Sequence, residues 1–202
     1  MQIHRPVKIC ALLLIVFGYS SVWPADRVVV LGDSLSDAYS MPRESGWVYL
    51  LDQSLGDDVQ LIDGSISGDT SSGAQARLDD LLELHQPQVL IVILGGNDGL
   101  RGLSPNQLRE NLAGIIAKGQ AAGAAVALMQ IRLPANLGRR YLDRFEAVYP
   151  ELAEQFSIPL WPFFLETLFD QPGMMMDDGI HPSEQAQPEI ARIVLSHLSG
   201  MP

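Results

Sequence analysis

The unbroken apolar run VLIVIL at residues 89–94, which Gly95 and Gly96 follow, is the strongest indication of the fold class. A strand with one wet face alternates apolar and polar residues, so an unbroken run predicts a strand buried on both faces, as in a parallel sheet. Similar short apolar runs, which we interpret as further strands of the same sheet, lie at 28–31, 59–62, 125–131 and 158–163. The sequence therefore predicts five strands spread along the chain.

The stretches between these runs have the spacing of amphipathic helices. Leu108, Leu112, Ile115 and Ile116 recur at intervals of three and four residues, after a helix-start signal at Ser104-Pro105. Other apolar stripes lie at 78–82, after a capping signal at Ser72, at 145–156, where Pro150 should kink or split the helix, and at 190–198. Alternating strands and helices predict a three-layer α/β/α sandwich around a central, mostly parallel five-stranded sheet of flavodoxin-like type.

The N-terminal residues differ from the rest of the chain. A short basic stretch with Arg5 and Lys8 precedes an uncharged apolar run at 9–17, and small residues follow. This layout is typical of a secretory signal peptide, and the apolar run is too short for a comfortable membrane span. We therefore expect a signal peptide at 1–25, one domain at 26–202, and a periplasmic or secreted protein that makes no stable membrane insertion after cleavage. An uncleaved N-terminal anchor is the alternative.

Composition excludes some classes of partner. The 202-residue chain has a net charge of −11, with 24 acidic and 13 basic residues, which argues against nucleic acid as a partner. Cys10 is the only cysteine and lies in the predicted signal peptide, so the mature domain would hold no disulfide. No group of His, Cys and Asp has the spacing of a zinc site, and we expect no metal and no cofactor.

Polar, glycine-rich segments follow the first three predicted strands. They are GDSLS from Gly32, DGSISGD from Asp63 and GGND from Gly95, and a fourth such segment, DGIHP, starts at Asp178. Open α/β sheets bind ligands outside the carboxyl ends of their strands. We therefore expect these segments to meet at one edge of the sheet and to form the functional site.

The residue types in these segments suit nucleophilic catalysis. A serine hydroxyl needs a base to take its proton, and Ser34 and His181 are the candidates. Asp178 lies three residues before His181, so its carboxylate can reach one ring nitrogen while the other faces the serine. The remaining histidines lie in the signal peptide or in amphipathic stretches where a structural role is expected: His4, His85 and His197.

The oxyanion formed during acyl transfer needs hydrogen-bond donors that already point at it. The candidates are the backbone N–H groups of Ser34 and Gly68 and the side-chain amide of Asn97. Each residue alone also has an ordinary interpretation, since glycine forms turns and asparagine caps helices. The order of all these elements, each after its strand, is what favours catalysis.

These motifs resemble the four sequence blocks of the SGNH (GDSL) hydrolases. The matching residues are LGDSL at 31–35, Gly68, the Gly95-x-Asn97-Asp98 segment and Asp178-x-x-His181. The resemblance extends over nearly all of residues 26–198, through the stretches GGNDGLRGL, QIRLPANLGRRY and DDGIHPSEQAQP. It implies Ser34 as nucleophile, Asp178 and His181 as its triad partners, and Gly68 and Asn97 as oxyanion donors. The G-x-S-x-G motif of the α/β-hydrolases is absent around Ser34.

The resemblance also implies that 99–104 forms a mobile loop over the acyl site, and that the region of Leu133 and Pro134 lines an acyl groove. The predicted protein is a monomeric serine esterase and thioesterase for small acyl esters, thioesters such as acyl-CoA, aryl esters and lysophospholipids. A carbohydrate or acetyl esterase with the same residues is the first alternative. A flavodoxin-like binding domain without catalysis is the second.

Other polar and apolar clusters receive structural interpretations. Asp33 and Asp37 flank the nucleophile, where a negative charge would oppose an oxyanion, so we expect them to accept hydrogen bonds. Three methionines at 174–176 predict an apolar plug or a pocket wall. Arg139 and Arg140 predict a surface pair at a helix start, with contact to anionic head groups as the alternative.

Overall fold

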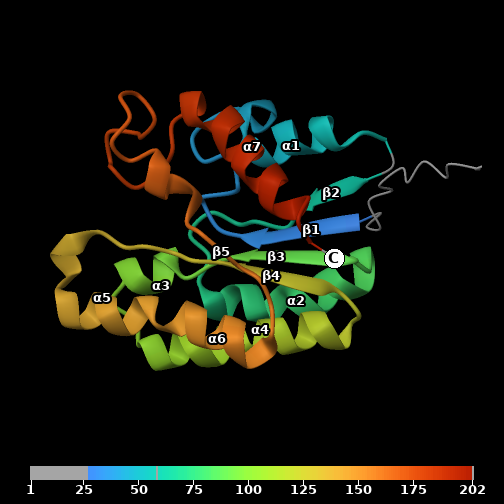
Figure 1. Ribbon diagram of the computed structural model, residues 1–202, viewed down its shortest axis with the longest axis horizontal. Coiled ribbons are helices and arrows are strands. Elements are labelled where there is room, and N and C mark those ends of the chain that lie inside the picture. Colours follow the sequence, from blue (N-terminus) through green and yellow to red (C-terminus); the bar gives the residue numbers. More distant parts are fainter. Residues whose placement is uncertain (1–26, 58, 202) are drawn as a thin grey trace, which may run out of the picture.

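The computed structural model describes residues 27–57 and 59–201, and Figure 1 shows their arrangement. The predicted signal peptide at 1–25, including Cys10, lies outside the described residues. Within the described ranges, no helix is both long and apolar enough to cross a membrane.

The centre of the molecule is a five-stranded sheet in which every pairing is parallel, as the sequence predicts. Its strands are β1 (Arg27–Gly32), β2 (Gln60–Asp63), β3 (Val89–Ile93), β4 (Ala125–Met129) and β5 (Leu160–Trp161), and their order is β2-β1-β3-β4-β5. The last two strands are shorter than the predicted runs at 125–131 and 158–163. Pro159 and Pro162 flank β5, and proline cannot donate a hydrogen bond to a neighbouring strand, which limits its length.

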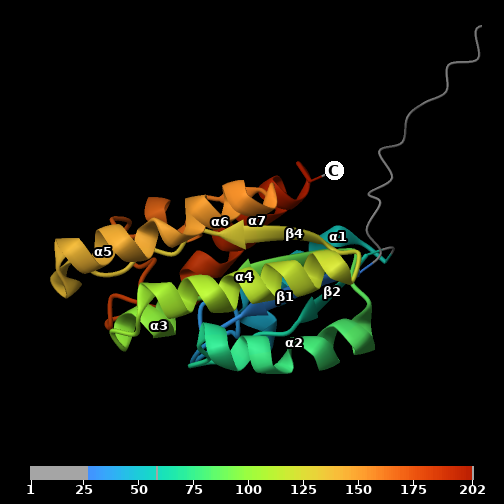
Figure 2. The same ribbon diagram turned by 90° about the horizontal axis from the view of Figure 1, so that it is seen from below.

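Helices cover both faces of the sheet and complete the predicted three layers. In Figure 1, α1 (Trp47–Leu55) and α7 (Gln187–Leu198) lie above the sheet. Below it lie α2 (Ser71–His85), α4 (Pro105–Ala121) and α6 (Val148–Phe156), and Figure 2 shows α4 between the other two. The remaining helices are short: α3 (Gly96–Leu100), α5 (Arg139–Glu146) and the 3₁₀ turns Arg43–Ser45, Ala135–Leu137, Phe164–Thr167 and Glu184–Ala186.

The predicted helix boundaries are correct in part. The helical stripe at 145–156 is divided at Ala147, just before Pro150, so the expected split is confirmed. The predicted start of α2 at Ser72 is wrong, because the side chain of Thr70 accepts from the Gly73 N–H and caps the helix two residues earlier. Helix α1 was not among the helices predicted.

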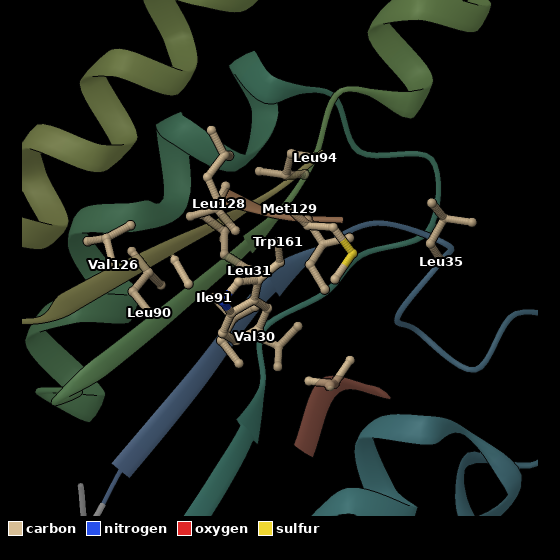
Figure 3. Packing of buried hydrophobic residues seen from close by; sticks show 14 of the residues in the cluster. Val30, Leu31, Leu35, Leu90, Ile91, Leu94, Val126, Leu128, Met129 and Trp161 are labelled. Atoms are coloured by element: carbon tan, nitrogen blue, oxygen red, sulfur yellow. The ribbon is translucent and has the colours of Figure 1, made fainter. Parts of the chain in front are cut away.

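The core lies between the sheet and its helices. All five residues of β3 are buried, and Figure 3 shows side chains of β1, β3 and β4 packed into one cluster. Trp47 of α1 is buried and donates its indole N–H to the carbonyl oxygen of Leu35 at 2.9 Å, which fastens the turn after β1 to the core. Gly32 is the last residue of β1, and this position requires glycine because an added Cβ would lie 2.8 Å from the hydroxyl oxygens of both Ser36 and Ser65.

Candidate active site

The loops that follow the strands meet at the carboxyl edge of the sheet and bring three predicted residues together. The Ser34 hydroxyl, in the turn after β1, lies 2.9 Å from Nε2 of His181. On the other side of the ring, Nδ1 lies 2.6 Å from the carboxylate of Asp178. Because a carboxylate can only accept, it favours the tautomer with the proton on Nδ1. The unprotonated Nε2 then accepts from the Ser34 hydroxyl.

Asp178 lies in an irregular segment on the surface. One of its oxygens accepts from the backbone N–H groups of Ile180 and His181 at 2.9 and 3.0 Å. Partial burial by itself raises the pKa of Asp178, but the hydrogen bonds from His181 and Ile180 outweigh it and lower the pKa from 3.8 to about 2. The carboxylate therefore stays ionised at neutral pH and keeps its partner ring oriented.

The segment that carries the histidine is attached to the core through its methionines. Met175 bridges to Pro182, and the Met176 N–H donates to the His181 carbonyl at 2.9 Å. Met174 and Met175 are partly buried against the hydrophobic core. Of the two predicted alternatives, an apolar plug or a pocket wall, these methionines therefore form the plug. They do not line the cavity described below.

Tyr39 stacks on the imidazole of His181, with ring centroids 4.0 Å apart and an angle of 21° between the planes. Its two neighbours, Ala38 and Ser40, have left-handed backbones with φ of 43° and 58°. Left-handed φ is uncommon outside glycine, and the other such residues in the described part of the chain are helix C-caps. No motif in the sequence predicted this contact, which connects the loop after β1 with the histidine loop.

The predicted oxyanion donors border the same space. Gly68 has φ of 79°, a conformation that favours glycine, and it lies on the wall of the cavity described below. Within the described residues, the N–H groups of Ser34 and Gly68 have no hydrogen-bond acceptor. The Asn97 amide donates one N–H to Asp33 at 3.1 Å and so retains a second donor.

Asp33 is a buried carboxyl group directly before Ser34. Only 1% of Asp33 is exposed, and its two oxygens accept separately from the Leu35 N–H, at 3.0 Å, and from Asn97. Burial raises the pKa of Asp33 from 3.8 to about 6, against the lowering effect of these hydrogen bonds. The expected hydrogen-bonding role of Asp33 agrees with this geometry.

A second buried carboxyl group, Asp98, follows Asn97 in α3. It is 3% exposed and accepts from both the backbone N–H and the hydroxyl of Ser71, at 2.8 and 2.6 Å. The Ser71 oxygen in turn accepts from the Asn111 amide at 2.9 Å. This network joins α3 to the start of α2 and to α4, so the backbone around Asn97 is fixed by two neighbouring helices.

Two further hydrogen bonds hold the loop that contains Gly68. Asp37 accepts from the Ser67 N–H at 2.9 Å, as expected of an acceptor at that position. The exposed Arg101 donates to the Gly68 carbonyl at 2.8 Å, from the segment after α3. The glycine is therefore held from both sides, and its N–H group remains free to face the cavity.

A cavity of about 580 Å³ opens beside these groups. Ser34, Gly68, Asn97 and His181 all lie on its wall, together with Tyr39. The rest of the wall is mainly apolar and includes Leu100, Ile131, Leu133, Pro134, Phe163 and Phe169. Leu133 and Pro134 thus lie where the resemblance implied an acyl groove, and a cavity of this size can accommodate a small-molecule substrate.

His85 and His197 have the expected structural positions, and His4 lies outside the described residues. His197 stacks on Trp161, with centroids 5.4 Å apart, and burial lowers its pKa. His85 ends α2, and its carbonyl accepts from Arg27. In the described ranges, no group of three His, Cys, Asp or Glu side chains could hold a metal ion.

The fold thus places a serine, a histidine and an aspartate, linked by hydrogen bonds in that order, at the mouth of an apolar cavity on a parallel α/β sheet. This is the arrangement of a serine ester hydrolase. Residues 30–187 match the GDSL-like Lipase/Acylhydrolase family. The chain therefore belongs to this family and is an ester hydrolase, which confirms the resemblance found in the sequence.

Individual relatives agree with this assignment. The chain is 45% identical over 195 residues to an arylesterase of Vibrio mimicus, an alignment that covers 95% of this chain and 98% of the relative. It is 50% identical over 167 residues to thioesterase 1/protease 1/lysophospholipase L1 of Escherichia coli K12, covering 83% and 80%. Among solved structures, the psychrotrophic esterase EstA from Pseudoalteromonas sp. superposes with a TM-score of 0.82 at 39% identity, covering 86% of this chain and 97% of EstA.

Proposed function

We propose that Ser34 is the nucleophile of a two-step acyl transfer, that His181 is its base and that Asp178 orients the histidine. The observation that supports this proposal is the continuous pair of contacts, 2.9 Å from Ser34 to His181 and 2.6 Å from His181 to Asp178, at the wall of the cavity. His181 takes the hydroxyl proton as the Ser34 oxygen attacks the acyl carbonyl.

The oxyanion is then held by the N–H groups of Ser34 and Gly68 and by the second N–H of Asn97. The first two N–H groups have no acceptor within the described residues, so they need no rearrangement before they bind the oxyanion. His181 returns its proton to the leaving alcohol or thiol. A water molecule, deprotonated by the same imidazole, then attacks the acyl-enzyme and releases the acid.

The preferred substrates are proposed to be acyl esters and thioesters with an extended apolar acyl group, including aryl esters, acyl-CoA and lysophospholipids. The apolar wall and the size of the cavity favour such groups over the short polar acyl groups of a carbohydrate or acetyl esterase. The names of the relatives, arylesterase and thioesterase 1/protease 1/lysophospholipase L1, support the same substrate class.

The domain limits and the location are part of the proposal. A signal peptide at 1–25, a hydrolase domain at 26–202 and export to the periplasm or beyond follow from the basic and apolar pattern of the first residues. We propose that the mature protein acts as a monomer without nucleic acid partners.

The test is hydrolysis of p-nitrophenyl esters, from acetyl to palmitoyl, by the wild type and by Ser34→Ala. The variant should lose turnover by at least about 10⁴-fold, because no other group can form the acyl-enzyme. Ser36→Ala is a matched control, since the Ser36 hydroxyl is buried two residues away and has no hydrogen-bond partner in the described part of the chain.

Equal turnover by the wild type and Ser34→Ala would refute the serine mechanism. A rate that is greatest with acetyl and falls with every longer acyl group would favour the acetyl esterase instead.

A further inference from the structure

Exposed apolar side chains gather around the mouth of the cavity. The described residues include six large apolar side chains that are more than a third exposed. Five of them lie on the loops and the short helix α3 at the carboxyl edge of the sheet: Tyr39 (38%), Ile66 (50%), Leu100 (39%), Leu103 (42%) and Phe169 (42%). The sixth, Leu84, is near the end of α2, at the opposite edge. We call the five residues the apolar rim.

The side of the mouth formed by residues 99–104 and 131–140 is basic. These two segments contain Arg101, Arg132, Arg139 and Arg140 and no acidic residue, in a chain whose net charge is −11. Arg132 and Arg139 form ion pairs with glutamate or aspartate side chains. Within the described residues, Arg101 and Arg140 have no carboxylate partner, and both are exposed.

The basic side and the apolar rim belong to one surface. The Tyr141 hydroxyl donates to the Leu103 carbonyl at 2.7 Å, so the start of α5, with Arg140, is fixed beside the loop after α3. Figure 1 shows α3 and α5 at the same end of the molecule. The acidic residues Asp170, Asp177 and Asp178 belong instead to the segment that leads to His181.

We infer that the apolar rim docks on a phospholipid bilayer that contains anionic lipids, with its apolar side chains in the interface and with Arg101 and Arg140 against lipid phosphates. This inference rests on the proposed function, because docking in this orientation would bring lipid acyl groups to the cavity mouth. Exposed apolar side chains together with unpaired arginines are the features that attract a protein to such an interface.

A second copy of the chain suits this surface less well. A symmetric contact would bring the unpaired arginines of both copies to the same interface, where like charges repel. It would also cover the cavity. A lipid surface instead offers phosphate to the arginines and an apolar interior to the rim.

The test is co-sedimentation of the mature protein with vesicles of phosphatidylcholine, with and without phosphatidylglycerol. The wild type should bind the mixed vesicles more strongly than the pure ones, and added salt should weaken that binding. The double variant Ile66→Ser/Leu103→Ser should bind about tenfold more weakly, because two apolar side chains no longer leave water. Arg140→Gln should reduce the preference for phosphatidylglycerol. Leu84→Ser, which removes the exposed leucine at the opposite edge, is the matched control and should bind like the wild type.

Equal binding by the double variant and the wild type would overturn the inference. So would a protein mass in solution that doubles with concentration in the wild type and not in the double variant, because the rim would then bind a second copy. Turnover of p-nitrophenyl esters is measured separately: its absence together with intact vesicle binding would refute the proposed function and leave the docking surface standing.

Discussion

The two halves of the candidate active site are built differently. The half with Ser34 and Asn97 rests on two buried carboxyl groups, Asp33 and Asp98, which are 1% and 3% exposed and bond to other elements of the fold. The half with His181 rests on Asp178, whose side chain is 39% exposed and whose hydrogen bonds all go to residues within three positions along the chain.

This difference in support determines in which half of the site a substitution affects both activity and stability. In the first half, a change at a supporting residue also disturbs the packing of β1, α2 and α4, because the same hydrogen bonds serve both purposes. In the second half the support is local, so activity should be lost without much loss of stability.

The largest effect is expected from Asp178→Asn. The asparagine carbonyl can still accept from the backbone, but its amide would face Nδ1 of His181 as a donor and favour the wrong tautomer. We expect ester turnover to fall by about 10³–10⁴-fold. The free energy of unfolding, measured in urea, should fall by no more than about 1 kcal/mol, because solvent weakens the hydrogen bonds of this partly exposed carboxylate.

Asp178→Ala controls for loss of the local hydrogen bonds, and it should be equally inactive. A loss of stability of several kcal/mol in Asp178→Asn would contradict the distinction between the halves.

The next largest effect concerns Asp33 and pH. Its folded pKa, about 6, lies above the ordinary aspartate value of 3.8, so the folded state holds the proton more tightly than the unfolded state. The resulting stabilisation is complete below about pH 4 and is lost as the pH rises through 6. The whole shift corresponds to about 3 kcal/mol, and about 2 kcal/mol of this is the expected change between pH 4 and 7 in the stability of the wild type relative to Asp33→Asn.

Urea unfolding of both proteins across this pH range measures that change. The asparagine replaces one of the two acceptor oxygens of Asp33 with a donor, which costs stability by an amount independent of pH. The comparison therefore concerns only how steeply the stability of each protein changes with pH. Parallel stability curves would show that Asp33 titrates as it does in the unfolded chain.

Asp98→Asn should reduce stability and activity together. Its two oxygens accept from two donors of Ser71, and an amide can serve only one of them. We expect a loss of about 1–3 kcal/mol in the free energy of unfolding. Turnover should fall as well, because α3 carries Asn97, whereas Asp79→Asn, in an exposed ion pair on α2, should change neither. Unchanged turnover in a destabilised Asp98→Asn protein would show that the hydrogen-bond network of Asp98 and Ser71 does not position Asn97 for its proposed role as an oxyanion donor.

The smallest effect is expected from Tyr39→Leu, which crosses from one half to the other. Loss of the stacked ring should lower kcat by about tenfold, because the contact that orients the imidazole is gone. Tyr39→Phe keeps the ring and should restore kcat. A leucine variant with the wild-type kcat would show that Tyr39 only lines the cavity.

Sequence patterns were sufficient to predict the parallel sheet and the residues that supply the chemical groups of the candidate active site. The unbroken run at 89–94 and its shorter counterparts predicted a parallel sheet, since burial on both faces requires such runs. The position after each strand then indicated Ser34, Gly68 and Asn97 as candidate site residues. The catalytic roles assigned to them await the experiments above.

Long-range support could not be read from the sequence. The hydrogen bond of Asn97 to Asp33 spans 64 positions, and the contact of Ser71 with Asp98 spans 27. No local pattern marks such partners, because their proximity is a product of the finished fold. Tyr39 is similar: its orientation depends on left-handed backbone at Ala38 and Ser40, residue types with no preference for that conformation. The start of α2 was misplaced because two serines follow Thr70 and any of the three can cap a helix.

Both ends of the described chain lie away from the cavity. Arg27 begins β1 at the amino edge of the sheet, and α7 runs back from the histidine loop so that residue 201 lies near the same edge (Figure 1). An affinity tag, a fusion partner or a solid support attached at either end would therefore leave the mouth unobstructed. The same geometry means that a short tether to a membrane at residue 27 would point the apolar rim away from that membrane. Docking of the rim on the tethering bilayer would then require a long linker or a released protein.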